Sequence, residues 1–222
     1  MNPAMANTEL WSQQAWRKAE HIYRAILDLP FVRQLADGTL DGDIFRRYIG
    51  QDSLYIANYC KVLAHIASRC SDPALTAAFL DFAKDGVEVE RALHSMYISE
   101  LPPEMSPACL FYTSILSAQA TAPVEVEAAA VLPCFWVYLR VGKHIAANMK
   151  PGNPYSQWIE TYSDPAFDAS NDRAIAICDR FAENTSPEVR DMMTRVFVEA
   201  TRMEWLFWHG AYTDIRWPEP IR

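Results

Sequence analysis

The sequence predicts an all-α protein, a single-domain bundle of about eight helices. Glycine is scarce, with 7 residues in 222, and most of the 14 prolines stand where a helix would begin. Apolar side chains recur at helical spacing, and no segment of useful length alternates apolar and polar residues as a half-buried strand would. One run shows this spacing clearly: Phe45, Ile49, Ile56, Tyr59, Val62, Leu63 and Ile66. No repeat or low-complexity linker divides the chain, so we expect one hydrophobic core.

Capping residues next to prolines mark the helix starts. A Ser, Thr, Asn or Asp side chain can accept a hydrogen bond from the free amides of the first turn, and proline fits that turn because its missing N–H is not needed there. Six such signals occur: Ser71-Asp72-Pro73, Ser106-Pro107, Thr121-Ala122-Pro123, Asn153-Pro154, Asp164-Pro165 and Ser186-Pro187-Glu188. With a first segment near Ser12 and a run opening near Asp41, they predict helices over residues 10–29, 42–69, 73–100, 107–120, 123–148, 154–162, 166–183 and 187–213. We expect a helical domain over residues 9–218 and flexible tails at residues 1–8 and 219–222.

Composition favours a small-molecule ligand. The formal net charge is −8, whereas nucleic acids and anionic membranes attract clustered Lys and Arg. The five cysteines are odd in number and form no CxxC pair, which indicates free thiols in a reducing compartment. The N-terminus does not resemble a signal peptide, and no apolar run reaches ~18 residues. We therefore expect a soluble cytoplasmic protein without a nucleic-acid or membrane partner.

The segment Leu132-Pro133-Cys134-Phe135-Trp136-Val137-Tyr138 holds the first candidate for catalysis. Proline removes a backbone N–H and clashes with the carbonyl four residues earlier, so we expect the helix to kink or restart at Pro133. Cys134 would then lie in a new first turn, where free amides and the helix dipole favour the reactive thiolate. The alternative is a buried cysteine that packs as a small apolar side chain.

Asp52, Tyr55 and Tyr59 share one face of a predicted helix, at positions i, i+3 and i+7. A carboxylate beside two phenols on a partly buried face suits recognition of amino groups or ring nitrogens by hydrogen bonds. The alternative is a solvated Asp52 flanked by tyrosines of the core.

Glu204 shares a face of the last helix with Phe207 and Trp208. A carboxyl packed against aromatic rings resists ionisation, and its raised pKa would suit an acid and base near neutral pH. The alternative is an exposed Glu204 paired with a cation such as Arg202.

A metal site has weaker support. Glu90 and His94 lie one helical turn apart, but di-iron bundles use Glu-x-x-His from two helices, and this chain has one Glu-x-x-x-His. His21 could serve as a haem ligand in a helical oxygenase, although a lone histidine more often only forms a hydrogen bond. A metal-dependent oxygenase therefore stays an alternative.

Several separated motifs resemble the TenA family, also called thiaminase II or aminopyrimidine aminohydrolase, over about residues 10–217. They are Pro30-Phe31, Asp37-Gly38-Thr39-Leu40, Tyr48-Ile49 with Gln51-Asp52, Leu132 to Tyr138, Asn153-Pro154-Tyr155, Trp158-Ile159 with Tyr162, Glu204 before Phe207-Trp208, Ala211-Tyr212 and Trp217-Pro218. The family often has His-Pro-Phe where this chain has Leu29-Pro30-Phe31, which leaves the pocket motifs intact.

The resemblance implies a haem-oxygenase-like bundle without haem, assembled as a homotetramer, that cleaves a substituent from the methylene of a 4-amino-2-methylpyrimidine without any cofactor. By motif position Cys134 resembles the family's nucleophile and Glu204 its acid and base. Asp52 matches the residue that holds the pyrimidine. The other substrate-binding residues implied are Tyr55, Tyr112, Tyr138, Tyr162 and Phe207.

The implied chemistry is attack of the thiolate on the pyrimidine ring, protonation of a ring nitrogen by Glu204, loss of the leaving group, and addition of water at the methylene. The product is 4-amino-5-hydroxymethyl-2-methylpyrimidine, released from the aminomethylpyrimidine in salvage or from thiamin. We expect the segment from Ser95 to Pro107 and residues near Tyr162 to form the outer wall of the pocket. A non-catalytic pyrimidine-binding or regulatory protein is the main alternative.

Overall fold

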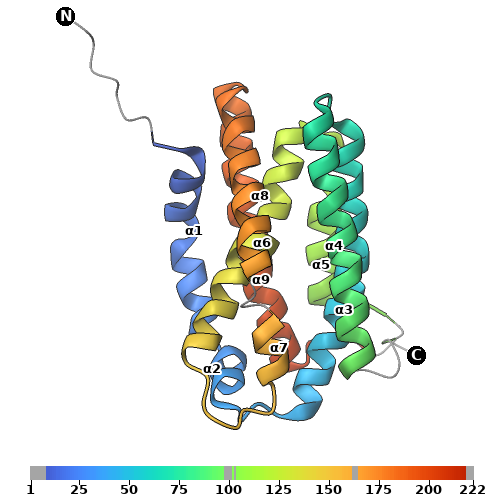
Figure 1. Cartoon of the computed structure of the whole chain (residues 1–222), viewed down its shortest axis with the longest axis vertical. Helices are drawn as coiled ribbons and strands as arrows, with labels where there is room; N and C mark the ends of the chain where they lie inside the picture. The colour runs from blue at the N-terminus through green and yellow to red at the C-terminus, as the bar shows by residue number, and fades with distance from the viewer. Residues whose placement is uncertain (1–8, 98–101, 103, 162–164, 219–222) are drawn as a thin grey trace, which may run out of the picture.

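The computed structural model describes residues 9–97, 102, 104–161 and 165–218, apart from the side chains of residues 90 and 93–96. Within these residues the chain is all-α, as the sequence predicts, and the long helices run side by side in a bundle (Figure 1). The tails expected at residues 1–8 and 219–222 lie outside the described residues. None of the helices in the described part of the chain is long and apolar enough to cross a membrane.

The helices follow the predicted order. They are α1 (Trp11–Leu27), α2 (Pro30–Asp37), α3 (Gly42–Arg69), α4 (Pro73–Tyr97), α5 (Pro107–Ser117), α6 (Val124–Ala147), α7 (Ser156–Thr161), α8 (Pro165–Glu183) and α9 (Pro187–Thr213), with a 3-10 turn, η1 (Ala118–Thr121), after α5. The capping signals are confirmed at three proline starts, where Asp72 accepts a hydrogen bond from the amide of Ala74 at 2.8 Å, and Ser106 and Ser186 accept from the amides of Cys109 and Val189, both at 3.3 Å.

The short helix α2 was not expected from the sequence. Pro30 occupies its first turn, where the missing N–H is not needed, and the helix ends at Gly38 with φ 74°. Glycine adopts this left-handed conformation without the steric cost that a side chain would bring. The first predicted helix, 10–29, therefore ends two residues early, at Leu27, and a turn separates it from α2.

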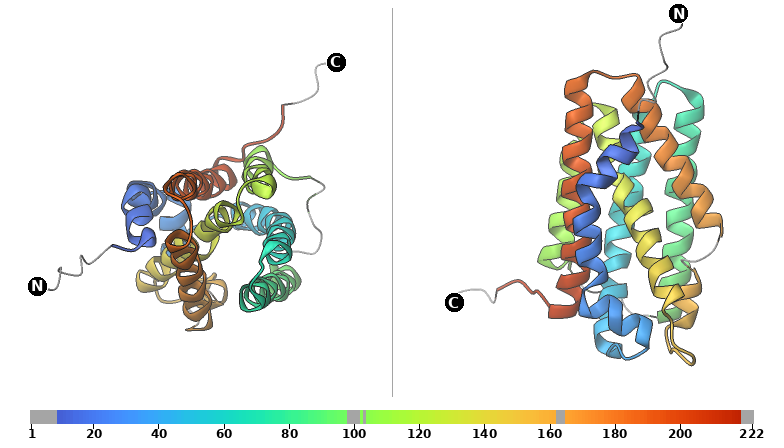
Figure 2. Two further views of the ribbon diagram at one scale, coloured as in Figure 1. Left: turned by 90° about the horizontal axis from the view of Figure 1, so that it is seen from above. Right: turned by 90° about the vertical axis from the view of Figure 1, so that its left-hand side faces the viewer.

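Helix α6 runs through the middle of the bundle and packs on α9, α8 and α3 (Figure 2). It continues without interruption from Val124 to Ala147 although Pro133 lies inside it. The restart expected at Pro133 is therefore wrong. Every side chain from Ala128 to Pro133 is buried, so packing on all sides holds the helical path and outweighs the lost backbone hydrogen bond.

The N-terminal helix is fastened to the C-terminal third of the chain. Asp179, buried on α8, accepts hydrogen bonds from the amide of Ser12 at 2.7 Å and from its hydroxyl at 2.8 Å. It thus caps α1 from another helix. The indole N–H of Trp11 donates to the hydroxyl of Thr194 on α9 at 3.0 Å, and α1 packs along α9.

Candidate active site

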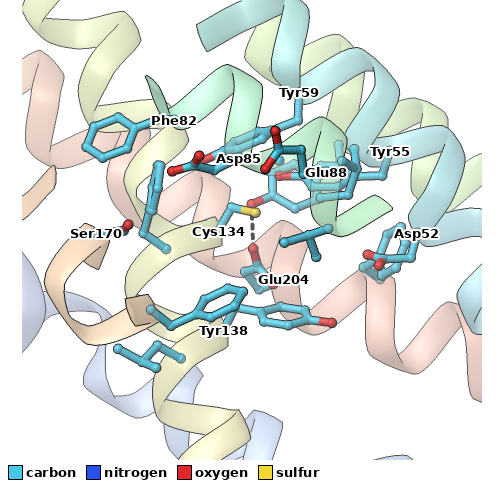
Figure 3. Close-up of a pocket in the computed structure, with 18 of the residues that line it drawn as sticks. Asp52, Tyr55, Tyr59, Phe82, Asp85, Glu88, Cys134, Tyr138, Ser170 and Glu204 are labelled. Carbon is cyan, nitrogen blue, oxygen red and sulfur yellow. Dashed lines mark hydrogen bonds between the residues drawn. The ribbon is translucent and has the colours of Figure 1, made fainter. Parts of the chain in front are cut away.

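A cavity of about 410 Å³ lies between the helices and takes residues from α3, α4, α5, α6, α8 and α9. Seven of the eight residues proposed from the sequence line it: Asp52, Tyr55, Tyr112, Cys134, Tyr138, Glu204 and Phe207. The eighth, Tyr162, lies outside the described residues. Figure 3 shows how the labelled side chains from these different helices face the same space.

Glu204 is buried on α9, with 3% of its surface exposed, and the hydroxyl of Tyr112 donates a hydrogen bond to its Oε1 atom at 2.7 Å. Burial raises the pKa of Glu204 to about 7, and the hydrogen bond from Tyr112 opposes this rise. The exposed alternative, with a pair to Arg202, is therefore wrong. A carboxyl with this pKa is present in both protonation states at neutral pH, as a general acid and base requires.

A second buried glutamate shows what Glu204 lacks. Glu127 on α6 is 1% exposed, and it is held by Arg69 at 2.6 Å and by Nδ1 of His65 at 2.7 Å. That pairing with the guanidinium compensates a buried charge and ties α3 to α6. Glu204 forms no ion pair among the described residues and receives its hydrogen bond from a neutral phenol, so its charged form stays costly.

Cys134 lies in the interior of α6, and its thiol faces the cavity near Glu204 (Figure 3). Burial raises the pKa of the thiol well above its usual value, and the charge of Glu204 raises it further, while hydroxyls of Tyr55 and Tyr59 oppose the shift. The prediction that a helix start stabilises a thiolate at Cys134 is therefore wrong, because α6 does not restart there. A thiolate can form here if Glu204 takes the thiol proton.

Aromatic rings wall the inner end of the cavity. The ring of Tyr55 lies 4.7 Å from that of Tyr112, 5.6 Å from that of Tyr59 and 5.7 Å from that of Phe207, measured between centroids. Tyr59 donates its hydroxyl to the carbonyl of Val131 at 2.9 Å. The hydroxyl of Tyr55 is buried and forms no hydrogen bond with the described residues in this structure, but it lies beside the Cys134 thiol, whose thiolate it would stabilise.

Asp52 is 6% exposed and lies on α3, one turn before Tyr55. It lies near two thiols: burial and then the charge of Asp52 raise the pKa of Cys109 to about 12, and the charge of Asp52 also contributes to the raised pKa of Cys134. The solvated Asp52 considered as an alternative is therefore wrong. A buried carboxylate beside aromatic walls can accept hydrogen bonds from an amino group and a protonated ring nitrogen.

Residues that sequence reasoning did not select form the outer part of the cavity. Helix α4 contributes Phe82, Asp85, Gly86, Glu88 and Val89, and helix α8 contributes Ala166, Phe167 and Ser170. None of the described residues of the segment from Ser95 to Pro107 lines the cavity, but residues 98–101 and 103 lie outside the described residues, so the outer wall expected there stays a prediction. The recurrence of 82, 85, 86 and 89 at helical spacing was the available signal for the α4 face.

The residues considered as metal ligands either lie away from the cavity or have side chains outside the described residues. His21 is exposed on α1 and does not line the cavity. The side chains of Glu90 and His94 lie outside the described residues. Among the side chains that are described, no three His, Cys, Asp or Glu residues come together as metal ligands.

The chain matches the model of the TENA/THI-4/PQQC family over residues 16–214. It belongs to this family. Among curated relatives of this family member, aminopyrimidine aminohydrolase of Bacillus subtilis is 34% identical, over 86% of this chain and 84% of the relative. The Helicobacter pylori protein of the same name is 31% identical, over 90% and 98%. The thiamine biosynthesis multifunctional protein ThiED of Corynebacterium efficiens is 32% identical over 94% of this chain, which spans only 29% of that larger protein.

Solved structures of TenA homologues confirm the haem-oxygenase-like fold of this family member. The homologue from P. horikoshii OT3 superposes with a TM-score of 0.82 at 25% identity and covers 92% of this chain and 99% of its own. The homologue from Pyrococcus furiosus has a TM-score of 0.85 at 21% identity, over 91% of this chain and 100% of its own.

Proposed function

We propose that the chain is an aminopyrimidine aminohydrolase of the thiaminase II type, a hydrolase that cleaves a C–N bond at the methylene attached to a 4-amino-2-methylpyrimidine. The observation that carries the proposal is the pairing, in one cavity, of the Cys134 thiol with a Glu204 carboxyl whose pKa is about 7. Curated relatives that bear the name aminopyrimidine aminohydrolase support it.

The inner end of the cavity would hold the pyrimidine ring. Asp52 would accept hydrogen bonds from the 4-amino group and from a protonated ring nitrogen, which a carboxylate can do and an apolar wall cannot. Tyr55 and Phe207 would lie against the ring, and Tyr112 and Tyr138 would complete the pocket, with Tyr162 assigned by resemblance alone. Aromatic contacts and burial exclude water from the reacting atoms.

The reaction would begin with a proton transfer, since both the thiol and the carboxyl resist ionisation. Glu204 as carboxylate takes the proton from Cys134, the thiolate forms a C–S bond to the electron-poor ring, and Glu204 returns the proton to a ring nitrogen. The electron pair then expels the leaving group from the methylene, as ammonia or as the thiazole. Water adds to that methylene, the C–S bond breaks, and hydroxymethylpyrimidine and the free thiol result.

We further propose that the aminomethylpyrimidine is the better substrate, which would make this a salvage enzyme. The test is turnover of 4-amino-5-aminomethyl-2-methylpyrimidine and of thiamin by the purified chain, followed as hydroxymethylpyrimidine released. We expect kcat/KM for the amine to be at least ~10-fold higher, a discrimination of about 1.4 kcal/mol. A ratio at or below one would refute salvage but not hydrolysis. Binding of hydroxymethylpyrimidine without turnover of either substrate would instead favour the non-catalytic alternative.

Assembly and location complete the proposal. A homotetramer with dihedral symmetry is supported by large apolar side chains that stay exposed in the single chain, namely Leu10, Leu80, Val87, Leu110, Phe111 and Trp217. Light scattering at about the mass of one chain, 25.3 kDa, would contradict it. A cytoplasmic location is supported by the five cysteines, which are all free thiols. The domain is proposed to extend over residues 9–218.

A further inference from the structure

We infer that Asp85 and Glu88 make the mouth of the cavity selective for cations, so that the enzyme favours substrates with a positively charged leaving group and rejects phosphorylated ones. This inference rests on the proposed function and adds the charge of the accepted substrates. It concerns two residues on α4 that lie outside the proposed chemistry. Neither was selected from the sequence.

The lining of the cavity has one sign of charge. The described residues that line it include four with carboxyl groups, Asp52, Asp85, Glu88 and Glu204. The described lining contains no Lys, Arg or His. Phosphate sites in proteins are built from cationic side chains or from free amides at helix starts. Among the described residues this cavity offers no cationic side chain, and its carboxylates would repel a phosphate.

The two outer carboxylates are exposed and lie one helical turn apart, and both are directed toward the cavity in Figure 3. Cations near them are few. Lys84 lies 3.5 Å from Glu88, and Arg173 is 3.1 Å from Asp81, whose charge it compensates. Asp85 forms no hydrogen bond or ion pair with any residue that the structure describes, so its charge is available to a ligand.

The inner end of the cavity indicates that the space bordered by the two outer carboxylates holds a ligand. The Tyr55 hydroxyl is buried without a partner among the described residues, and an unpaired buried hydroxyl is costly unless something binds it. A volume of about 410 Å³ exceeds what a methylpyrimidine alone needs. With the ring at the inner end, the group on its methylene points toward the mouth, since the leaving group must depart to solvent.

The charges of the candidate substrates differ at that position. An aminomethyl group and a thiazolium each carry one positive charge at neutral pH, whereas a phosphate on the thiazole side chain adds about two negative charges. At ~6 Å in water, one unit charge changes the affinity of another about threefold. Asp85 should therefore be worth about threefold on a cation, and Glu88, which Lys84 partly compensates, should bring the pair to at most about tenfold. The effect should weaken with added salt.

The experiment compares thiamin with thiamin monophosphate, and uses neutral hydroxymethylpyrimidine as the reference ligand. In the wild-type chain we expect kcat/KM for thiamin to exceed that for the monophosphate by at least ~10-fold at low salt. In Asp85→Asn/Glu88→Gln this ratio should fall at least ~3-fold, and its dependence on salt should flatten. The inhibition constant of hydroxymethylpyrimidine should stay unchanged, because this product carries no charged group on the methylene that points toward the mouth.

The matched control is Asp191→Asn/Glu199→Gln, which removes two exposed carboxylates from α9 that line a separate surface hollow. An equal fall of the ratio in this control would overturn the inference in favour of overall net charge. An unchanged ratio in Asp85→Asn/Glu88→Gln would also overturn it, as would a changed affinity for hydroxymethylpyrimidine. If the wild-type chain turns over neither amine nor thiamin, the proposed function fails, and binding of the two thiamin forms by calorimetry still tests the mouth.

Discussion

Two glutamates in one cavity, Glu204 at the inner end and Glu88 at the mouth, show how position decides the chemistry of one side chain. Glu204 is buried among aromatic rings, and its pKa is raised to about 7. Glu88 is exposed, with 61% of its side chain in contact with solvent, and it lies 3.5 Å from a lysine. The inner carboxyl is suited to exchange protons, while the outer one is suited to act as a fixed charge.

The largest expected effect tests the chemistry of the inner end. Replacing Cys134 with Ser should lower kcat at least ~100-fold, because the attacking thiolate is lost. Binding of hydroxymethylpyrimidine, measured by calorimetry, should be kept. Cys178→Ser is the control, since Cys178 is also a buried thiol with a raised pKa but does not line the cavity. Near-normal turnover by Cys134→Ser would remove the proposed nucleophile.

Replacing Glu204 with Gln tests whether this glutamate, and not Glu88, transfers protons during catalysis. We expect kcat to fall ~100-fold or more, the usual contribution of general acid and base catalysis. The wild-type kcat/KM should rise with pH through about 7, as the carboxylate that accepts the thiol proton becomes populated. Glu88→Gln should keep this inflection. A pH profile that is the same in Glu204→Gln and in the wild type would assign the inflection to another group.

The same substitution should have an opposite effect on stability. The folded pKa of Glu204, about 7, is above its ordinary value of 4.5, so the unfolded chain binds fewer protons between these values and stability falls as pH rises through them. From pH 5 to pH 8 this costs roughly 2–3 kcal/mol, to order of magnitude. Glu204→Gln should lose that pH-dependent cost, and Glu88→Gln should retain it. Urea unfolding at the two pH values measures the difference, and equal slopes in all three proteins would show that Glu204 is not desolvated.

Asp52 gives the smallest of these effects and tests recognition at the inner end. Asp52→Ala should weaken binding of hydroxymethylpyrimidine by about 1.5–3 kcal/mol, the value of a lost charged hydrogen bond. Turnover should fall as well. Asp28→Ala, at an exposed position after α1, serves as the control. If product affinity survives in Asp52→Ala, the pyrimidine must be held by other groups.

The sequence predicted the helices better than the local environment of the reacting groups. Helix starts follow from caps and prolines within a few residues, so Ser106 and Ser186 could be identified directly. Pro133 shows where such local rules stop, because burial on every side of α6 keeps a helix that a proline alone would interrupt. The state of Cys134 was missed for the same reason, since it depends on that unbroken helix and on the carboxyl of Glu204.

The residues at the inner end of the cavity could be predicted from the sequence, whereas those at the mouth could not. The inner residues carry motifs of chemically distinctive side chains, and seven of them meet in one space. The mouth is formed where α4 and α8 face each other. The helical spacing of residues 82, 85, 86 and 89 marks one face of α4, but it does not show that this face meets α8. Which faces meet depends on packing between helices distant in sequence, which hydrophobic periodicity alone does not specify.

The cap that Asp179 places on α1 has a consequence for synthesis of the chain. The first helix emerges from the ribosome long before its partners, since Ser12 and Asp179 are 167 residues apart and Trp11 and Thr194 are 183 apart. Until α8 and α9 arrive, the free amides of α1 lack the cap from Asp179 and its apolar face lacks α9, although Trp16 can already meet Trp136 of α6. The native packing of α1 is therefore completed only when the last two helices have been translated, and a nascent chain that stalls before them presents a partly uncovered first helix to chaperones.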